Sequence, residues 1–260
     1  MFNYIRNLLR YRELLYFLTL REIKAKYKQT VLGVSWAILQ PLSLMTVFTV
    51  VFSFFASLPS DGVPYVLFSY CALLPWQFFA GVLGRGVGSL LGNQVLVNKV
   101  YFPREIIPFA VVFSATVDFA IGGIIFFGLL WYYGVHLTIL SLLVVPMFFL
   151  QVFFVVGLVL ILSPLNVFYR DIGLAIPLLV QIWMFATPIV YPLSLVPERF
   201  RPFYALNPMA GIIDGFRKII LHGMPPDLLS LTVAVVISLA TLTVGLLYFK
   251  SVEFKLADVL

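Results

Sequence analysis

The chain has 260 residues, of which 62% are hydrophobic and only 11% carry a charge. Soluble domains carry about 25% charged residues, so the composition excludes an ordinary soluble domain and indicates an integral membrane protein. The formal net charge of +6 does not indicate nucleic-acid binding, because Lys and Arg fall mainly between apolar runs, as membrane topology requires.

The N-terminal segment, residues 1–30, alternates basic and apolar positions, which predicts an amphipathic helix on the membrane surface. Leu14 and Leu18 can face one way while Arg21 faces another. The cations of the segment are Arg6, Arg10, Arg12, Arg21, Lys24, Lys26 and Lys28. Such a cluster favours a cytoplasmic N-terminus, either as a plain topology signal or as a docking surface.

Six apolar runs follow, each close to the roughly 20 residues that a bilayer-spanning helix needs. We expect residues 31–260 to form a six-span transmembrane domain, with helices at about 36–56, 65–91, 107–133, 139–162, 174–191 and 228–249. Most of the 17 Lys and Arg residues then fall on one side, so both termini are predicted to be cytoplasmic.

The first two spans carry an aromatic stripe and a series of small residues. Phe48, Phe52 and Phe55 recur at helical spacing and should share one face, for packing or for stacking on sugar rings. Small residues fall at every fourth position in the second span: Ala80, Gly84, Gly88 and Gly92. This spacing predicts close approach of another helix. Arg85, near the cytoplasmic end, is expected to reach the interface. Cys71, the single cysteine, is a packing residue and excludes an intrachain disulfide.

A short charged segment, residues 98–106, separates the second and third spans. Its charges are costly in hydrocarbon, and its aromatic tip is stiffened by proline. The residues concerned are Lys99, Tyr101, Phe102, Pro103, Arg104 and Glu105. The segment can serve as a handle for a partner outside the bilayer, although a cytoplasmic turn with interfacial aromatics explains the same pattern.

Asp118 lies near the middle of the third span. Ser114 and Gly122 share its helix face, so the carboxylate should point toward protein or water rather than lipid. A proton relay would need further intramembrane acids or histidines. The neighbouring runs lack them, and we therefore expect a hydrogen bond between helices.

The fifth span and the segment after it combine aromatic rings, hydroxyls and a proline break. Trp183, Thr187 and Tyr191 recur at four-residue steps, which suits a carbohydrate path, although an interfacial anchor explains Tyr191 equally well. Residues 192–227 are predicted to be external and yet remain apolar. They predict either re-entrant half-helices beside a pore or an amphipathic surface hairpin.

Enzymatic sites have no support in the sequence. It holds no G-x-x-x-x-G-K-[ST] phosphate loop, no H-E-x-x-H metal helix and no nucleophile elbow. The only histidines, His136 and His222, fall in predicted external turns. We therefore predict no catalytic residue and no metal site, and transport is favoured over catalysis.

Several segments in order resemble the polysaccharide-export permeases of ATP-binding-cassette transporters. They are REIKAKYKQTVLGVSWAILQP (21–41), LLPWQFF (73–79), NKVYFPREIIP (98–108), LNVFYRDI (165–172), WMFATPIVYP (183–192) and ALNPMAGIIDGFR (205–217). The resemblance covers nearly the whole chain. It implies a subunit that moves a lipid-linked polysaccharide, such as O-antigen, capsule or teichoic acid, across the bacterial inner membrane.

The resemblance also implies the partners and the sites. It implies a homodimer with two copies of a separate ATPase subunit, which binds the ATP and magnesium, so that this chain carries no cofactor of its own. It makes segment 98–106 and the N-terminal helix the ATPase contacts, adding Arg21, Lys24 and Lys28 to the coupling residues. Segment 203–222, with Asn207, Pro208 and Phe216, becomes an external gate.

The resemblance favours one substrate class without excluding others. Phe48, Phe52, Phe55, Trp183, Thr187 and Tyr191 are the predicted channel lining. A permease of the same superfamily that exports a drug or a sugar-free lipid is the nearest alternative, because fold alone does not fix substrate. An ion-coupled secondary transporter is the other, with Asp118 as its only central acid.

Overall fold

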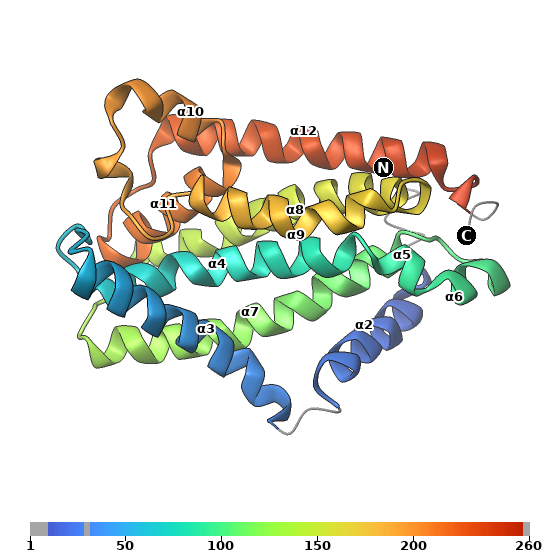
Figure 1. Ribbon diagram of the computed structural model, residues 1–260, viewed down its shortest axis with the longest axis horizontal. Coiled ribbons are helices and arrows are strands. Elements are labelled where there is room, and N and C mark those ends of the chain that lie inside the picture. The colour runs from blue at the N-terminus through green and yellow to red at the C-terminus, as the bar shows by residue number, and fades with distance from the viewer. Residues whose placement is uncertain (1–9, 29–31, 257–260) are drawn as a thin grey trace.

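The computed structural model describes residues 10–28 and 32–256, and this part of the chain is a helical bundle without β-strands (Figure 1). Within these described ranges, five helices are long and apolar enough to cross a membrane: Trp36–Phe55 (α3 continued by the π-helix η2), Tyr65–Gly86 (α4), Ile106–Tyr132 (α7), Ile139–Phe168 (η3 and α8) and Leu228–Val252 (α12). The prediction of an all-α integral membrane protein is thus confirmed.

The fifth predicted span, 174–191, forms a shorter helix. α9 (Asp171–Phe185) has 15 residues, or about 22 Å at 1.5 Å per residue, which is less than the roughly 30 Å hydrocarbon core of a bilayer. Turns and short helices follow: η4 (Leu193–Leu195), η5 (Glu198–Phe200) and α10 (Arg201–Ala205). The exact count of six spans is therefore not confirmed.

The two ends of the bundle differ in chemistry. α2 (Arg12–Tyr27), α5 (Ser89–Gly92), α6 (Gln94–Lys99) and the last turn of α12 lie at one end, which we call the basic end (Figure 1). The turns after α3 and α7, together with α10, lie at the other, which we call the loop end. Residues 1–9 and 29–30 of the predicted interface helix fall outside the described residues.

α4 is the centre of the bundle. Its side chains are buried along nearly the whole helix, because α3, α7, α8, α9 and α11 (Pro208–Leu221) all pack against it. α11 is itself almost completely buried against α4, α8 and α12 at the loop end. This position fits a re-entrant helix rather than a hairpin on the surface.

Glycines allow a close helix crossing, although not the crossing that the sequence pattern suggested. A Cβ atom on Gly157 of α8 would lie 2.5 Å from the carbonyl carbon of Thr241 in α12, and one on Gly245 would lie 2.5 Å from the Gly157 oxygen. These glycines let the two backbones touch. A Cβ atom on Gly84 or Gly92 would have no described neighbour within 4 Å. Close helix packing along that series therefore stays a prediction.

Candidate functional site

The segment from the end of α6 to the start of α7 exposes one aromatic and one charged residue and buries one of each. Tyr101 is 89% exposed and Lys99 is also exposed at the tip, whereas Phe102 is only 4% exposed and Glu105 2%. Pro103 is half-buried between them. In this conformation, Lys99 and Tyr101 are the coupling candidates that offer a surface to a partner.

The same segment is attached to the end of α12. The Arg104 backbone N–H donates to Glu253 Oε1 at 3.3 Å, and its guanidinium donates to the Glu253 backbone carbonyl. Lys250 pairs with the Glu253 carboxylate at 2.6 Å. Burial raises the pKa of the Glu105 carboxyl above its ordinary value. Arg104 therefore holds the segment against the end of α12, and Glu105 is buried beside it. Sequence spacing alone did not reveal this role of Arg104.

The N-terminal helix α2 lies along α7 and carries three predicted coupling cations. Arg21 donates from its guanidinium to the side-chain oxygen of Asn93, between α5 and α6. Lys24 and Lys28 are exposed. α2 is thus connected directly to the segment that bears the exposed tip.

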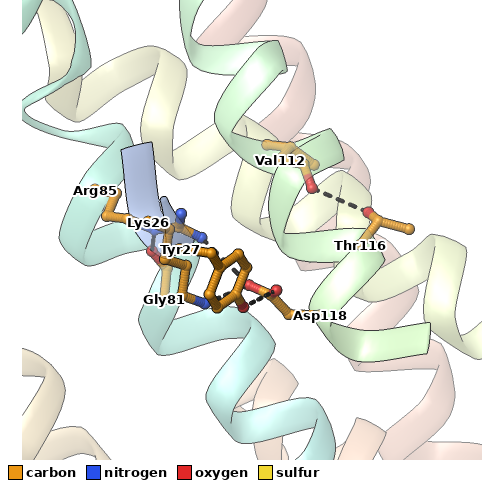
Figure 2. A network of polar contacts seen from close by, with 7 residues as sticks. All are labelled: Lys26, Tyr27, Gly81, Arg85, Val112, Thr116 and Asp118. Atoms are coloured by element: carbon orange, nitrogen blue, oxygen red, sulfur yellow. Dashed lines mark hydrogen bonds and ion pairs between the residues drawn. The ribbon is translucent and has the colours of Figure 1, made fainter. Parts of the chain in front are cut away.

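Asp118 joins three helices, as Figure 2 shows. Lys26 Nζ lies 2.5 Å from Asp118 Oδ2, and the Tyr27 hydroxyl donates to Oδ1 at 2.5 Å. Arg85 Nη2 from α4 lies 3.8 Å from Oδ2. Burial and the bond to Asp118 raise the pKa of the Tyr27 hydroxyl, so it remains a donor. The expected contact between helices is present, with the N-terminal helix as its main partner.

Asp118→Asn is expected to loosen α2 without unfolding the bundle. The amide loses the ion pair with Lys26 and weakens the Tyr27 bond, at a cost of about 1 kcal/mol for such partly exposed groups. Hydrogen–deuterium exchange of the α2 amides should rise about fivefold, while α4 stays protected. Asp171→Asn, which changes an exposed acid at the start of α9, is the control. Unchanged exchange in α2 would contradict the role of Asp118.

The aromatic stripe of the first span does not remain on one face. Phe48 is buried and packs edge-on against Phe52, with ring centroids 5.6 Å apart, whereas Phe55 is exposed. Thr49–Phe55 is a π-helix, whose i→i+5 hydrogen bonds widen the turn and change the direction of successive side chains. Channel lining by these three residues stays a prediction.

The other predicted lining residues meet the predicted gate at the loop end. Trp183 Nε1 donates to Asn207 Oδ1 at 3.0 Å, and Asn207 Nδ2 donates to Thr187 Oγ1 at 2.9 Å. Asn207 also caps α11 by accepting from the Met209 N–H at 3.1 Å. Tyr191 bonds to the Tyr204 hydroxyl at 2.7 Å. The fold therefore brings the fifth-span residues and the start of the gate helix, at Pro208, into one polar cluster.

One residue at this end was missed by sequence reasoning. Arg217 of α11 is only 4% exposed, and its guanidinium lies 3.5 Å from the Phe68 ring centre. It donates to the backbone carbonyls of Phe68, Pro188, Ile189 and Tyr191. Phe216 beside it is fully buried. Arg217 thus connects the irregular turns after α9 to α11 and to α4.

No group of three or more His, Cys, Asp or Glu side chains that could hold a metal ion occurs among residues 10–28 and 32–256. Several charged groups of this part of the chain form ion pairs, as Asp118 does with Lys26 and Glu253 with Lys250. The described residues thus place an exposed tip at one end of the bundle and a polar cluster around Asn207 at the other.

Comparison with known proteins identifies relatives along the whole chain. Residues 13–221 match the family model described as ABC-2 type transporter. The chain is 30% identical to the O-antigen export system permease protein RfbA of Myxococcus xanthus, over 99% of both chains. It is 27% identical to an RfbA of Klebsiella pneumoniae over 95% of both. It is 24% identical to the polysialic acid transport protein KpsM of Escherichia coli over 91% of this chain and 92% of the relative.

Proposed function

The chain belongs to the ABC-2 type transporter family, and from this premise we propose that it is the membrane subunit of an ATP-driven polysaccharide exporter. The substrate is a lipid-linked polysaccharide of the O-antigen, capsule or teichoic acid type, moved across the bacterial inner membrane. The observation that carries the proposal is the full-length relation to an O-antigen export permease, at 30% identity. A capsule-type relative, the polysialic acid transport protein, supports the same substrate class.

ATP hydrolysis belongs, in this proposal, to a second subunit. The sequence lacks a phosphate loop, so the energy source must be supplied by a partner that binds ATP and magnesium. Two copies of this chain assemble with two copies of that subunit. The basic end faces the cytoplasm, supported by the Lys and Arg residues gathered there on α2 and near α6.

Coupling follows from the contacts at the basic end. Closure of the ATPase pair pushes on the exposed tip at Lys99 and Tyr101. Arg104 and Glu253 pass the displacement to α12, and the bond from Arg21 to Asn93 passes it to α2. The ligand must have different free energies in the two conformations, because otherwise the movement performs no transport. Aromatic rings suit the path, since they stack on sugar faces without demanding one hydrogen-bond pattern.

The proposal is tested by transport with the purified complex. We expect proteoliposomes that hold this subunit and its cognate ATPase subunit to translocate a lipid-linked polysaccharide only when ATP is supplied. Omitting the ATPase subunit should reduce transport to background, and an imposed proton gradient should not replace ATP. Translocation of a sugar-free lipid at the same rate as the glycan would show that the substrate class is wrong.

The structure also bears on the ion-coupled alternative. The Asp118 carboxylate is held between Lys26 and Tyr27 at 2.5 Å each. A carboxylate engaged in this way supports helix docking better than it supports a transported ion or proton. ATP-driven transport that survives Asp118→Asn would exclude ion coupling through this residue.

A further inference from the structure

A cavity of about 440 Å³ opens beside the Asp118 cluster, and the proposed function has not yet given it a role. It lies between the start of α3, the second half of α4 and the middle of α7. Its polar lining consists of Lys26, Gln40, Gln77, Arg85 and Asp118, and the rest is mainly apolar and aromatic. The space exists because Gly81 and Gly84 present no side chain to it.

Two hydrogen-bond donors of the cavity lining lack an acceptor. Gln77 Nε2 and Arg85 Nη1 are buried, and neither has a hydrogen-bond partner among the described residues. Nearly all buried polar groups in folded proteins are hydrogen-bonded, so two unsatisfied donors in one lining call for a ligand that brings acceptors. A buried guanidinium nitrogen is a particularly costly group to leave unpaired.

The charges of the lining favour an anion. Asp118 is already occupied by Lys26 at 2.5 Å and by Tyr27, whereas Arg85 Nη2 stands 3.8 Å from the carboxylate. Lys26, Arg85 and Asp118 together leave one positive charge. Arg85 Nε reaches only its own helix, at the Gly81 carbonyl 3.4 Å away. The Arg85 guanidinium therefore retains a free donor. Its planar, forked arrangement of N–H groups can bond two oxygens of one phosphate at once, which a ligand with a single acceptor atom cannot match.

The position of the cavity indicates the kind of molecule to which the bound anion belongs. Arg85 lies one residue before the end of the spanning helix α4, and Lys26 lies one residue before the end of α2 (Figure 2). The site thus lies beside the ends of α2 and α4 and the middle of α7, where charged groups border apolar spanning helices. Trp76 and Phe78 supply apolar wall beside the charged groups. A ligand that joins a phosphate to a hydrocarbon chain satisfies both parts of the lining at once.

We propose that this cavity binds the phosphate group of a lipid, with Arg85 and Gln77 as the donors. Two sources carry this chemistry: a phospholipid of the bilayer, and a phosphate on the lipid anchor of the exported glycan. The second source rests on the proposed function, and the first does not. Asp118 orients the site by holding Lys26 and limiting the net positive charge.

The test measures binding of hexadecyl phosphate to the complete complex of this subunit with its ATPase, by native mass spectrometry. Arg85→Gln should lower occupancy at least about tenfold, the loss expected for a charge-assisted hydrogen bond. Gln77→Leu removes no hydrogen bond seen in the structure and should lower occupancy severalfold. Arg170→Gln, which removes the same charge from an exposed loop, should bind like the wild type.

Two results would overturn the site. One is equal hexadecyl phosphate occupancy in the wild type and Gln77→Leu, a variant that decides the matter even if Arg85→Gln does not assemble. The other is displacement of the phosphate by hexadecyl maltoside at equal concentration, because an uncharged head group cannot satisfy Arg85.

A second measurement distinguishes the two sources. If a phospholipid is the occupant, basal ATPase activity should be higher in phosphatidylglycerol nanodiscs than in nanodiscs of an uncharged galactolipid, and Arg85→Gln should abolish that difference. If the glycan's anchor is the occupant, basal activity should be equal in both, and Arg85→Gln should remove only the stimulation by lipid-linked glycan. A wild-type complex that moves no glycan would refute the proposed function while leaving the phosphate-binding result intact.

Discussion

Tyr101→Ala is expected to reduce polysaccharide export strongly while leaving the subunit folded. The Tyr101 side chain is 89% exposed, so truncating it to alanine leaves no cavity inside the folded chain. Tyrosines at the centre of protein interfaces commonly contribute about 2 kcal/mol or more, which corresponds to a roughly 30-fold loss of affinity. We expect export to fall at least about tenfold in proteoliposomes, with an unchanged thermal unfolding midpoint.

The neighbouring aromatic residue should behave in the opposite way. Phe102 is 4% exposed, and Phe→Ala substitutions in a packed core cost about 3–5 kcal/mol. Phe102→Ala should therefore lower the thermal unfolding midpoint of the subunit. A loss of export in this variant would then report lost stability rather than lost coupling to the ATPase. Tyr132→Ala, at an 80% exposed tyrosine of the opposite end, is the matched control and should leave export intact. Normal export by Tyr101→Ala would show that the tip is only a turn, and α2 would then be the main contact.

The contrast between these neighbours shows where sequence reasoning stopped. Apolar runs predict spanning helices because a bilayer demands about 20 apolar residues in succession, and five helices in the part of the chain that the structure describes satisfy that requirement. Inside the irregular segment after α6 no periodicity relates one side chain to the next. Phe102 turns inward into the buried core, and nearby Arg104 contacts Glu253, 149 positions away in the sequence. Such long-range contacts cannot be read from the segment itself.

The glycine pattern did not locate the close helix crossing for a related reason. The series of small residues that begins in α4 and ends in α5 looked like a packing surface, yet Gly84 lines the cavity. A close backbone crossing is instead formed at Gly157 and Gly245, which are isolated in their runs. Close packing depends on the side chains of both helices, and the sequence pattern of one helix does not show which helix faces it. The cavity is the part of the candidate site that required the fold, since its lining combines α2, α3, α4 and α7.

Arg217→Met is expected to be the most destabilising single substitution at the loop end. Methionine is apolar, so the carbonyls of Pro188 and Ile189 would lose charge-assisted bonds and remain buried. Phe68 would lose both its carbonyl bond and the stacked cation. Removing one member of a buried charged network costs about 3–5 kcal/mol. We expect a much lower unfolding midpoint in detergent and little folded protein in the membrane.

The matched control separates this buried role from a general need for positive charge. Arg199→Met removes a cation from the same end at an exposed position, and surface changes of this kind usually stay within about 0.5 kcal/mol. Arg217→Lys should lie between the two, because one ammonium cannot reproduce the planar fork that reaches separate carbonyls. A wild-type unfolding midpoint for Arg217→Met would mean that the turns after α9 are held by packing alone. α11 would then be free to move relative to these turns without a large loss of stability.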